Sequence, residues 1–252
     1  MANIFQNIWK YFVNALYPKR LKCIICDAEI EDENKYSICY DCIRNLPFNN
    51  QNVCERCGEK IDDLAKFCNS CKNNNNRHFD KARAVFNYTD MIVDLIHGMK
   101  FNQKRYIARY LSEYLLDEFE RHNWKIDVIV PIPMSEKRRK EREYNQTEEL
   151  CYAFKQKGYN VDFEHFIKAV DTPHQTNLTK KERMENLKNS FAVTDKLVFK
   201  NKNVLIIDDV YTTGSTMEEA SAVIKKAGAK EVYCLTVAHT LPMKYREDSE
   251  NN

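Results

Sequence analysis

The amino-acid sequence predicts an α/β fold with a mainly parallel sheet, preceded by a small cysteine-rich domain. After residue 77, apolar runs that fit buried strands alternate with helical patterns, which indicates a sheet covered by helices on both faces. Before that residue, eight of the ten cysteines fall in four Cys-x-x-Cys pairs. A chain of 252 residues has room for one sizeable domain and one small domain.

The elements of the α/β part follow from its hydrophobic periodicity. A strand buried on both faces is a continuous run of Val, Ile and Leu. By this criterion we expect strands at 82–88, 127–132, 164–170, 203–207 and 231–238, and helices at 91–100, 105–121, 144–157 and 217–226. Gly228 follows the last helix and fits its C-terminal cap. Cys234 lies in a strand-like apolar run, where we expect a buried small hydrophobe.

The four Cys-x-x-Cys pairs have the spacing of zinc ligands. They are Cys23/Cys26, Cys39/Cys42, Cys54/Cys57 and Cys68/Cys71, separated by 12, 11 and 10 residues. Two such pairs form a closed tetrahedral site with four thiolates, so pairing neighbours along the chain gives two structural Zn²⁺ ions. An interleaved pairing of the four is the geometric alternative.

Disulfides are the other common use of paired cysteines, and they need an exported protein. Residues 1–20 lack the uninterrupted apolar core and the cleavage site of a signal peptide. They carry an apolar stripe that predicts an amphipathic helix, which packs on the rest of the chain or docks on a partner or a membrane surface. No stretch approaches the ~20 apolar residues of a membrane span. We therefore expect a cytoplasmic protein, and its net charge of +2 implies no global field for polyanions.

Residues 204–216 read VLIIDDVYTTGST, an apolar strand followed by two aspartates and a hydroxyl-rich loop. The loop between such a strand and the next helix is where α/β sheets bind ligands, and its free N–H groups favour a phosphate. Asp208 and Asp209 are placed to accept hydrogen bonds from ribose hydroxyls. The alternative is an aspartate pair that turns the chain before a helix. In either case Ser215 is a plausible N-cap, because Glu218 lies in capping-box register.

This run resembles the 5-phosphoribosyl-1-pyrophosphate (PRPP) signature of type I phosphoribosyltransferases. Residues 127–135, DVIVPIPMS, resemble the pyrophosphate loop of the glutamine amidophosphoribosyltransferase type. KRRKEREYNQ at 137–146 and the HQT and KERMENL motifs at 174–176 and 181–187 follow in order. With the cysteine pairs, the chain resembles the ComF family, in which a double zinc ribbon precedes a phosphoribosyltransferase domain. Some members of that family are linked to DNA uptake in natural competence.

The resemblance implies a PRPP site with Mg²⁺ bound to the pyrophosphate. Asp208 and Asp209 hold the ribose, and the 5′-phosphate lies on Tyr211, Thr212, Thr213, Gly214, Ser215 and Thr216. The pyrophosphate loop is Pro131, Ile132, Pro133, Met134 and Ser135. Lys100, Arg138, Arg139 and Arg142 neutralise the diphosphate or a polynucleotide; the alternatives are an ordinary surface lysine and a solvated helix face. Residues 175–187 form a segment that closes over PRPP.

The domains that we expect are an N-terminal helix (1–20), a double zinc ribbon (21–72), a linker (73–76) and a phosphoribosyltransferase-like domain (77–245). Glu143 replaces a glycine that the family often has, which raises the question of whether the local turn survives. Thr212 replaces the aspartate of hypoxanthine-guanine enzymes and cannot act as their base. The sequence also has no glutaminase module. We expect a PRPP-dependent enzyme of unknown acceptor; the alternatives are a single-stranded DNA-handling competence factor, working with other competence proteins, and a PRPP-sensing regulator.

Overall fold

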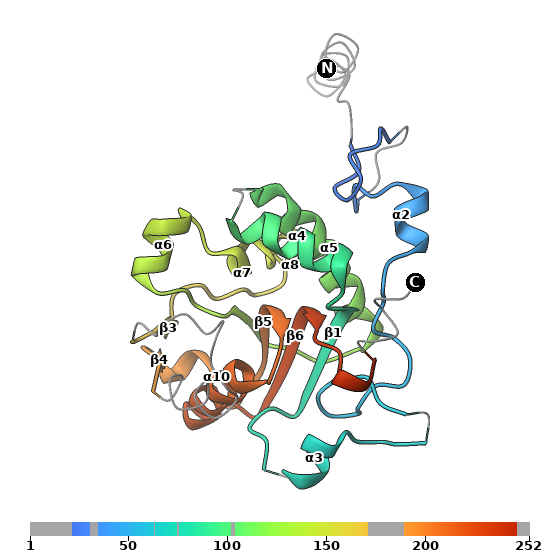
Figure 1. The fold of residues 1–252 in the computed structure, drawn as a ribbon. Coiled ribbons are helices and arrows are strands. Elements are labelled where there is room, and N and C mark those ends of the chain that lie inside the picture. Colours follow the sequence, from blue (N-terminus) through green and yellow to red (C-terminus); the bar gives the residue numbers. More distant parts are fainter. Residues whose placement is uncertain are drawn as a thin grey trace, which may run out of the picture. The chain divides into compact units, whose positions relative to one another are not determined.

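A four-stranded parallel sheet organises the larger part of the molecule (Figure 1). The computed structural model describes residues 22–30, 35–62, 64–74, 76–101, 104–170 and 189–245. The chain forms two compact units, Met1–Asn45 and Leu46–Asn252. The predicted amphipathic helix at 1–20 and the predicted closing segment at 175–187 lie outside the described residues.

The strand order is β1-β6-β5-β2, and all three pairings are parallel. The strands are β1 (Lys81–Asn87), β2 (Val128–Pro131), β5 (Asn203–Tyr211) and β6 (Glu231–His239). In β5 and β6 nearly every residue is buried, because helices or loops cover both faces of the sheet. The predicted α/β class and the buried state of Cys234 are therefore confirmed.

Helices cover the sheet on two sides (Figure 1). One side holds α4 (Asp90–Phe101), α5 (Arg105–Arg121), α7 (Gln146–Glu149) and α8 (Tyr152–Gln156), and the other holds α10 (Ser215–Lys226). The remaining described helices are α2 (Tyr40–Arg44), α3 (Asn69–Asn73), α6 (Glu136–Arg142) and the short 3₁₀ turns η1 (Lys196–Val198) and η2 (Met243–Tyr245).

The helix that we expected at 144–157 is wrong as one continuous element. It is two short helices, α7 and α8, with Leu150 and Cys151 between them. The amide of Ala153 donates to the hydroxyl of Ser112 on α5, at 3.2 Å, instead of to a carbonyl of the preceding turn. A contact from a distant part of the chain therefore replaces a local hydrogen bond.

The strand expected at 164–170 is shorter and does not join the parallel sheet. It is β3 (Phe166–Lys168), which pairs in antiparallel fashion with β4 (Phe191–Val193) in a separate two-stranded sheet. The rings of Phe166 and Phe191 lie 5.3 Å apart and belong to the main core, so this hairpin is anchored by its aromatic side chains.

The ends of α10 show one prediction wrong and one confirmed. Its N-cap is Gly214, at φ 76°, and no side chain caps the helix, so the predicted capping box is absent. Glu218 instead accepts hydrogen bonds from the backbone N–H of His78, at 3.0 Å. At the other end, Gly228 has φ 97°, and the amide of Ala229 donates to Ile224 O at 3.3 Å, which closes the predicted glycine cap.

The sheet face under α10 carries one contiguous core that includes the second group of cysteines. Cys54, Cys57, Cys68 and Cys71 belong to the same buried cluster as Val204, Ile206 and Cys234 of the sheet and Met217 and Ile224 of α10. Spatial contacts thus join residues on both sides of the predicted linker at 73–76, and the four sequence-based segments remain a prediction. Within the described residues, no helix is long and apolar enough to cross a membrane.

Glu143 keeps the turn after α6 although it is not glycine. It caps the helix in the left-handed region, with φ 65° and ψ −15°. Its amide donates to Arg139 O at 2.8 Å, so the helix ends as it would with glycine. An L-residue there stores about 1 kcal/mol or more of backbone strain.

Glu143→Gly should therefore stabilise the protein by about 0.5–1 kcal/mol, since the strain relieved exceeds the added entropy of the unfolded chain. Urea unfolding measures this change. The matched control, Glu141→Gly, lies inside α6 and should destabilise by about 1 kcal/mol. A destabilising Glu143→Gly would show that the side chain has a role of its own.

Candidate functional site

A cavity of about 350 Å³ opens at the carboxyl ends of β2 and β5. It is lined by the segment after β2, the start of α10, the end of α4 and the β3–β4 hairpin. The sequence-predicted residues that it brings together are Lys100, Ile132, Pro133, Met134, Ser135, Arg138, Arg142, Asp208, Asp209, Thr212 and Thr216. The predicted residues that do not line it are Pro131, Arg139, Tyr211, Thr213, Gly214 and Ser215.

The two aspartates lie inside β5, because the strand continues four residues beyond its predicted end at 207 and stays paired with β6 to Tyr211. Asp208 is 9% exposed and Asp209 is 6% exposed. Lys100 Nζ lies 2.9 Å from an oxygen of Asp209, and Gln146 Nε2 donates to the other at 3.0 Å. Lys100 therefore lines the cavity and is ion-paired to a buried carboxyl, unlike an ordinary surface lysine, and its role toward a diphosphate stays a prediction.

The neighbouring carboxylate behaves differently. Asp208 Oδ1 accepts the backbone N–H of Asp209 at 2.8 Å. Burial, and then the negative charge of Asp209, raise the pKa of Asp208 to about 8. Near neutral pH, the carboxyl of Asp208 is therefore protonated, whereas the carboxyl of Asp209 is the one that Lys100 contacts. Both oxygen pairs are suited to ribose hydroxyls or to a hard cation such as Mg²⁺, which oxygen ligands hold.

Cations outnumber anions around the cavity. Arg142 lies 4.8 Å over the ring of Phe101, and burial lowers the pKa of its guanidinium. Arg138 and Lys168 also line the cavity. Four basic side chains, Lys100, Arg138, Arg142 and Lys168, line the cavity against two aspartates, of which Asp208 is neutral near pH 7, so the cavity favours a ligand with several negative charges. Arg139 instead pairs with Glu148 outside the cavity. For this arginine, the position agrees with the alternative of a solvated helix face.

Two side chains hold the segment after β2 in place. The carbonyl of Ile132 accepts hydrogen bonds from Asn145 Nδ2, at 3.2 Å, and from Thr147 Oγ1, at 2.6 Å. The amide of Ile132 donates to Ile207 O at 2.9 Å. Ser135 then caps α6 by accepting the N–H of Arg138 at 3.4 Å. The segment 132–135 is thus fixed in an extended course along one wall of the cavity.

The sequence motifs did not identify Asn145, Gln146 and Thr147 as site residues, although the Asn-Gln pair lies within KRRKEREYNQ. These residues line the cavity, as do Tyr88, Lys168 and Phe191. The last three have no local sequence signal, because only the packing of β3 and β4 and the end of β1 brings them to the cavity.

The loop between β5 and α10 consists of Thr212, Thr213 and Gly214. The hydroxyls of Thr213 and Ser215 lie 2.8 Å apart, and the N–H of Ser215 donates to Thr213 Oγ1 at 3.4 Å. A Cβ at Gly214 would lie 2.2 Å from the hydroxyl of Tyr211, and φ is 76°. Glycine is therefore required there for two independent reasons. We call Thr212–Thr216 the phosphate loop, after its predicted ligand.

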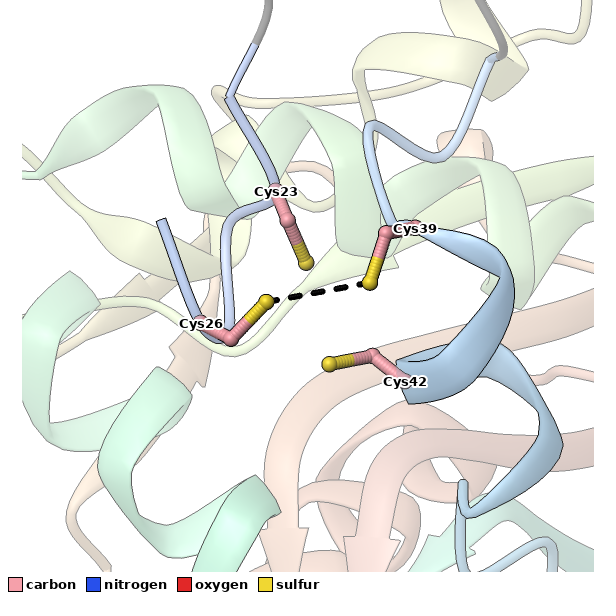
Figure 2. Close-up of side chains that lie close together, drawn as sticks. All are labelled: Cys23, Cys26, Cys39 and Cys42. Atoms are coloured by element: carbon pink, nitrogen blue, oxygen red, sulfur yellow. Dashed lines mark hydrogen bonds between the residues drawn. The ribbon is translucent and has the colours of Figure 1, made fainter. Parts of the chain in front are cut away.

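The cysteines form two groups of four, and each group can hold a metal ion. In each group the four sulfurs lie within 4.8 Å of one another: Cys23, Cys26, Cys39 and Cys42 in the first cluster, and Cys54, Cys57, Cys68 and Cys71 in the second. Figure 2 shows the first cluster, whose sulfurs point toward a common centre, with Cys26 and Cys39 Sγ 3.7 Å apart. In the second cluster, Cys57 and Cys68 Sγ lie 3.6 Å apart.

These distances fit zinc, because a tetrahedron with Zn–S bonds of about 2.3 Å has sulfur–sulfur edges of about 3.8 Å. Pairing of neighbours along the chain is confirmed, and the interleaved alternative is excluded. All ten cysteines are described, and none is in a disulfide.

The two clusters repeat the same local design. An antiparallel bridge closes each first knuckle, between Lys22 and Glu29 and between Val53 and Lys60. The residue after the knuckle has positive φ in both, 57° at Asp27 and 74° at Gly58. The third cysteine of each cluster, Cys39 or Cys68, begins a short helix that carries the fourth.

The sequence comparisons agree with this geometry. Residues 12–72 match the model of a double zinc ribbon domain, and residues 158–251 match that of the phosphoribosyl transferase domain. The parallel sheet with its phosphate loop and the two cysteine clusters thus define a phosphoribosyl transferase domain that follows a double zinc ribbon.

Among curated proteins, the chain is 29% identical over 221 residues to competence protein F of Haemophilus influenzae, with 84% of this chain and 93% of that protein covered. It is 25% identical over 235 residues to competence protein ComFC of Bacillus subtilis, with 86% and 95% covered. It is 29% identical over 208 residues to DNA utilization protein YhgH of Escherichia coli K12, with 79% and 90% covered. The predicted resemblance to the ComF family is confirmed.

A solved adenine phosphoribosyltransferase from Saccharomyces cerevisiae is 19% identical, with a TM-score of 0.32 over 52% of this chain and 68% of that chain.

Asp208→Asn should change stability in a way that depends on pH. Because the folded pKa of Asp208 lies near 8, above its usual value of 3.8, the folded wild type keeps a proton that the unfolded chain loses. Wild-type stability therefore falls as pH rises from about 4 to 8, and Asn does not share this loss. We expect the advantage of Asp208→Asn to grow by at least about 1.4 kcal/mol between pH 5 and pH 8, equal to one pKa unit.

Chemical denaturation at the two pH values measures the difference. Asp94→Asn, at an exposed position of α4 outside the cavity, is the control and should stay within about 0.5 kcal/mol of wild type at both. An Asp208→Asn advantage that is equal at pH 5 and pH 8 contradicts the proposed protonation.

Proposed function

We propose that the protein binds PRPP with Mg²⁺ in this cavity and transfers its phosphoribosyl group to a base or amine whose identity is unknown. The observation that carries the proposal is the buried pair Asp208–Asp209, ion-paired to Lys100 between two loops that can hold phosphates. The family match to a phosphoribosyl transferase domain supports it.

Each part of PRPP has a matching group of residues. In the proposal, the ribose hydroxyls donate to the carboxylates of Asp208 and Asp209. The 5′-phosphate accepts hydrogen bonds from the N–H groups and hydroxyls of the phosphate loop, at the positive end of the α10 dipole. The diphosphate lies along 131–135, with the charges of Lys100, Arg138 and Arg142 beside it. Mg²⁺ bound by diphosphate and carboxylate oxygens would stabilise the charge that develops on the leaving pyrophosphate.

The protein's own contribution to the reaction is positioning and charge. Lys100 is already held by Asp209, so a diphosphate can take over this cation at little cost in side-chain entropy. Asn145 and Thr147 fix the carbonyl of Ile132, which aligns the pyrophosphate loop before the ligand arrives.

A titration of PRPP in the presence of Mg²⁺ tests the binding step. We expect Asp208→Asn/Asp209→Asn to weaken PRPP binding at least tenfold, about 1.4 kcal/mol, because each change replaces a carboxyl oxygen that can accept a ribose hydroxyl with an amide NH2 that cannot. Asp94→Asn removes one exposed carboxylate of α4 and should bind like wild type. Equal affinity of the double variant and wild type would mean that PRPP does not bind at this pair. Release of pyrophosphate with added base or amine acceptors then distinguishes an enzyme from a PRPP sensor.

A second candidate function is the handling of single-stranded DNA, which the names of the relatives and the surface of α6 both support. Lys137 and Lys140 are exposed on α6, and Phe101 beside Arg142 is 56% exposed. Cations with an exposed aromatic ring are the elements of a site for single strands.

We propose a cytoplasmic location, which the ten free thiols support.

In the DNA proposal, Lys137→Gln/Lys140→Gln should flatten the dependence of log affinity on log salt by about 1.4, which is two phosphate contacts on a single strand. Fluorescence anisotropy with an oligothymidine at several salt concentrations gives this slope. Lys196→Gln/Lys200→Gln, two lysines near η1 that do not line the cavity, are the control and should leave the slope unchanged. An unchanged slope in the α6 variant excludes this surface.

A further inference from the structure

The second cysteine cluster and the phosphate loop are parts of one packed core. Cys57 and Cys71 belong to the same buried cluster as Phe79, Tyr211 and Met217. Tyr211 is the residue immediately before the phosphate loop, and Met217 is in the first turn of the helix that follows it. The residues on either side of the loop therefore belong to the same buried core as the second cysteine cluster.

Tyr211 is the first of two connections. Its side chain does not line the cavity, and its hydroxyl lies against Gly214, where an added Cβ would be only 2.2 Å away. Its ring stacks on His239, with centroids 4.5 Å apart, and meets the edge of Phe79 at 6.4 Å. Tyr211 thus fills the space between the core and the loop, and any shift of the core around it moves the backbone at Gly214.

Arg77 is the second connection, and it is polar. Its NH2 group donates to the hydroxyl of Ser70, at 2.8 Å, and Ser70 lies on α3 between the last two cysteines of the cluster. Its NH1 group lies 3.5 Å from Glu218, in the first turn of α10. The Arg77 side chain is only 8% exposed, and its guanidinium lies 5.7 Å over the ring of Phe79. A buried ion pair with this geometry is costly to break, so it links α3 to the start of α10.

The knuckle itself is joined to the sheet. The amide of Ala82 in β1 donates to Arg56 O, within the knuckle, at 2.6 Å. A Cβ at Gly58 would lie 3.0 Å from Ala82 O, so the turn after the knuckle packs directly against β1. The cluster cannot change shape without disturbing the core face on which the loop rests.

We propose that zinc held by Cys54, Cys57, Cys68 and Cys71 sets the geometry of the phosphate loop, with Tyr211 and Arg77 as the positioning residues. Four thiolates need a cation to stay together, and without it α3 is free to move and to take Ser70 away from Arg77. Coupling of this kind is reciprocal: a phosphate ester on the loop retains zinc in the second cluster, by the same factor by which zinc favours the ester. The proposal rests on the proposed binding of PRPP at this loop. We propose no coupling between zinc in the first cluster and the phosphate loop.

The experiment measures zinc release to a colorimetric chelator from the full chain carrying Cys26→Ser/Cys42→Ser, so that the signal comes from the second cluster alone. At equilibrium with the chelator, PRPP with Mg²⁺ should raise the apparent zinc affinity of the second cluster at least fivefold. Arg77→Met in the same chain should reduce this protection to less than twofold. Arg56→Met, an arginine of the same ribbon that stacks on Phe67, should keep it and is the matched control. In the chain with both clusters, release from the first cluster should not respond to PRPP.

A ligand-free measurement separates the failure of this inference from failure of the proposed function. Hydrogen exchange of the amides in 211–217 should accelerate at least fivefold when zinc is removed from the second cluster, with the amides of α5, whose buried residues lie outside that core, as the internal reference. If calorimetry detects PRPP binding but zinc release is unaffected, the coupling is overturned and the proposed function stands. If PRPP does not bind, the proposed function fails. In that case, equal hydrogen-exchange rates of the amides in 211–217 with and without zinc overturn the coupling as well.

Discussion

The parallel ladder between β5 and β6 is the constraint on which the site depends. It runs from Asn203 to Tyr211, where the last register pair is Tyr211 with His239. Because the strand stays paired this far, Asp208 and Asp209 are held in the sheet rather than in a loop, and burial raises the pKa of Asp208. Only three residues, 212–214, then separate β5 from α10, and Gly214 at positive φ allows the chain to turn within this length.

Electrostatics at the end of this ladder is arranged before any ligand binds. Asp208 is neutral and Asp209 is paired with Lys100. The basic side chains that line the cavity outnumber the acidic ones. Bringing two carboxylates together in a buried place is unfavourable unless a proton, a cation or hydroxyl donors compensate the charge. A sugar with hydroxyls on one side and phosphates on the other supplies the missing donors and the missing anions together.

The sequence was sufficient for the parts of the fold whose determinants are local. The VLII run gave the central strand, Gly228 gave the helix end, and the cysteine spacing gave both clusters, because each signal is contained in a few adjacent residues. It failed where a distant residue changes the local outcome. Ser112 accepts the hydrogen bond of the Ala153 amide, which would otherwise continue the helix through 150–153. The amide of His78 donates to Glu218, the carboxylate that was expected to complete the capping box.

The site divides in the same way. Asp208, Asp209 and the segment 132–135 could be found from strand ends, since the carboxyl edge of a parallel sheet collects them. Lys168 and Phe191 reach the cavity only through an antiparallel hairpin whose pairing no local pattern encodes. The role of Tyr211 was also hidden, because its position in the motif suggested a ligand contact, whereas its ring packs into the core.

The burial of the second cysteine cluster in the main core changes how the chain can be divided. A cut at the polar run 73–76, where the sequence changes character, would remove the cover over one face of the sheet and expose Phe79 and Ala82. A cut between Asn45 and Leu46 follows the packing instead. The compact unit that holds the sheet therefore also contains the second cysteine cluster, and the two clusters, so alike in local design, belong to different compact units.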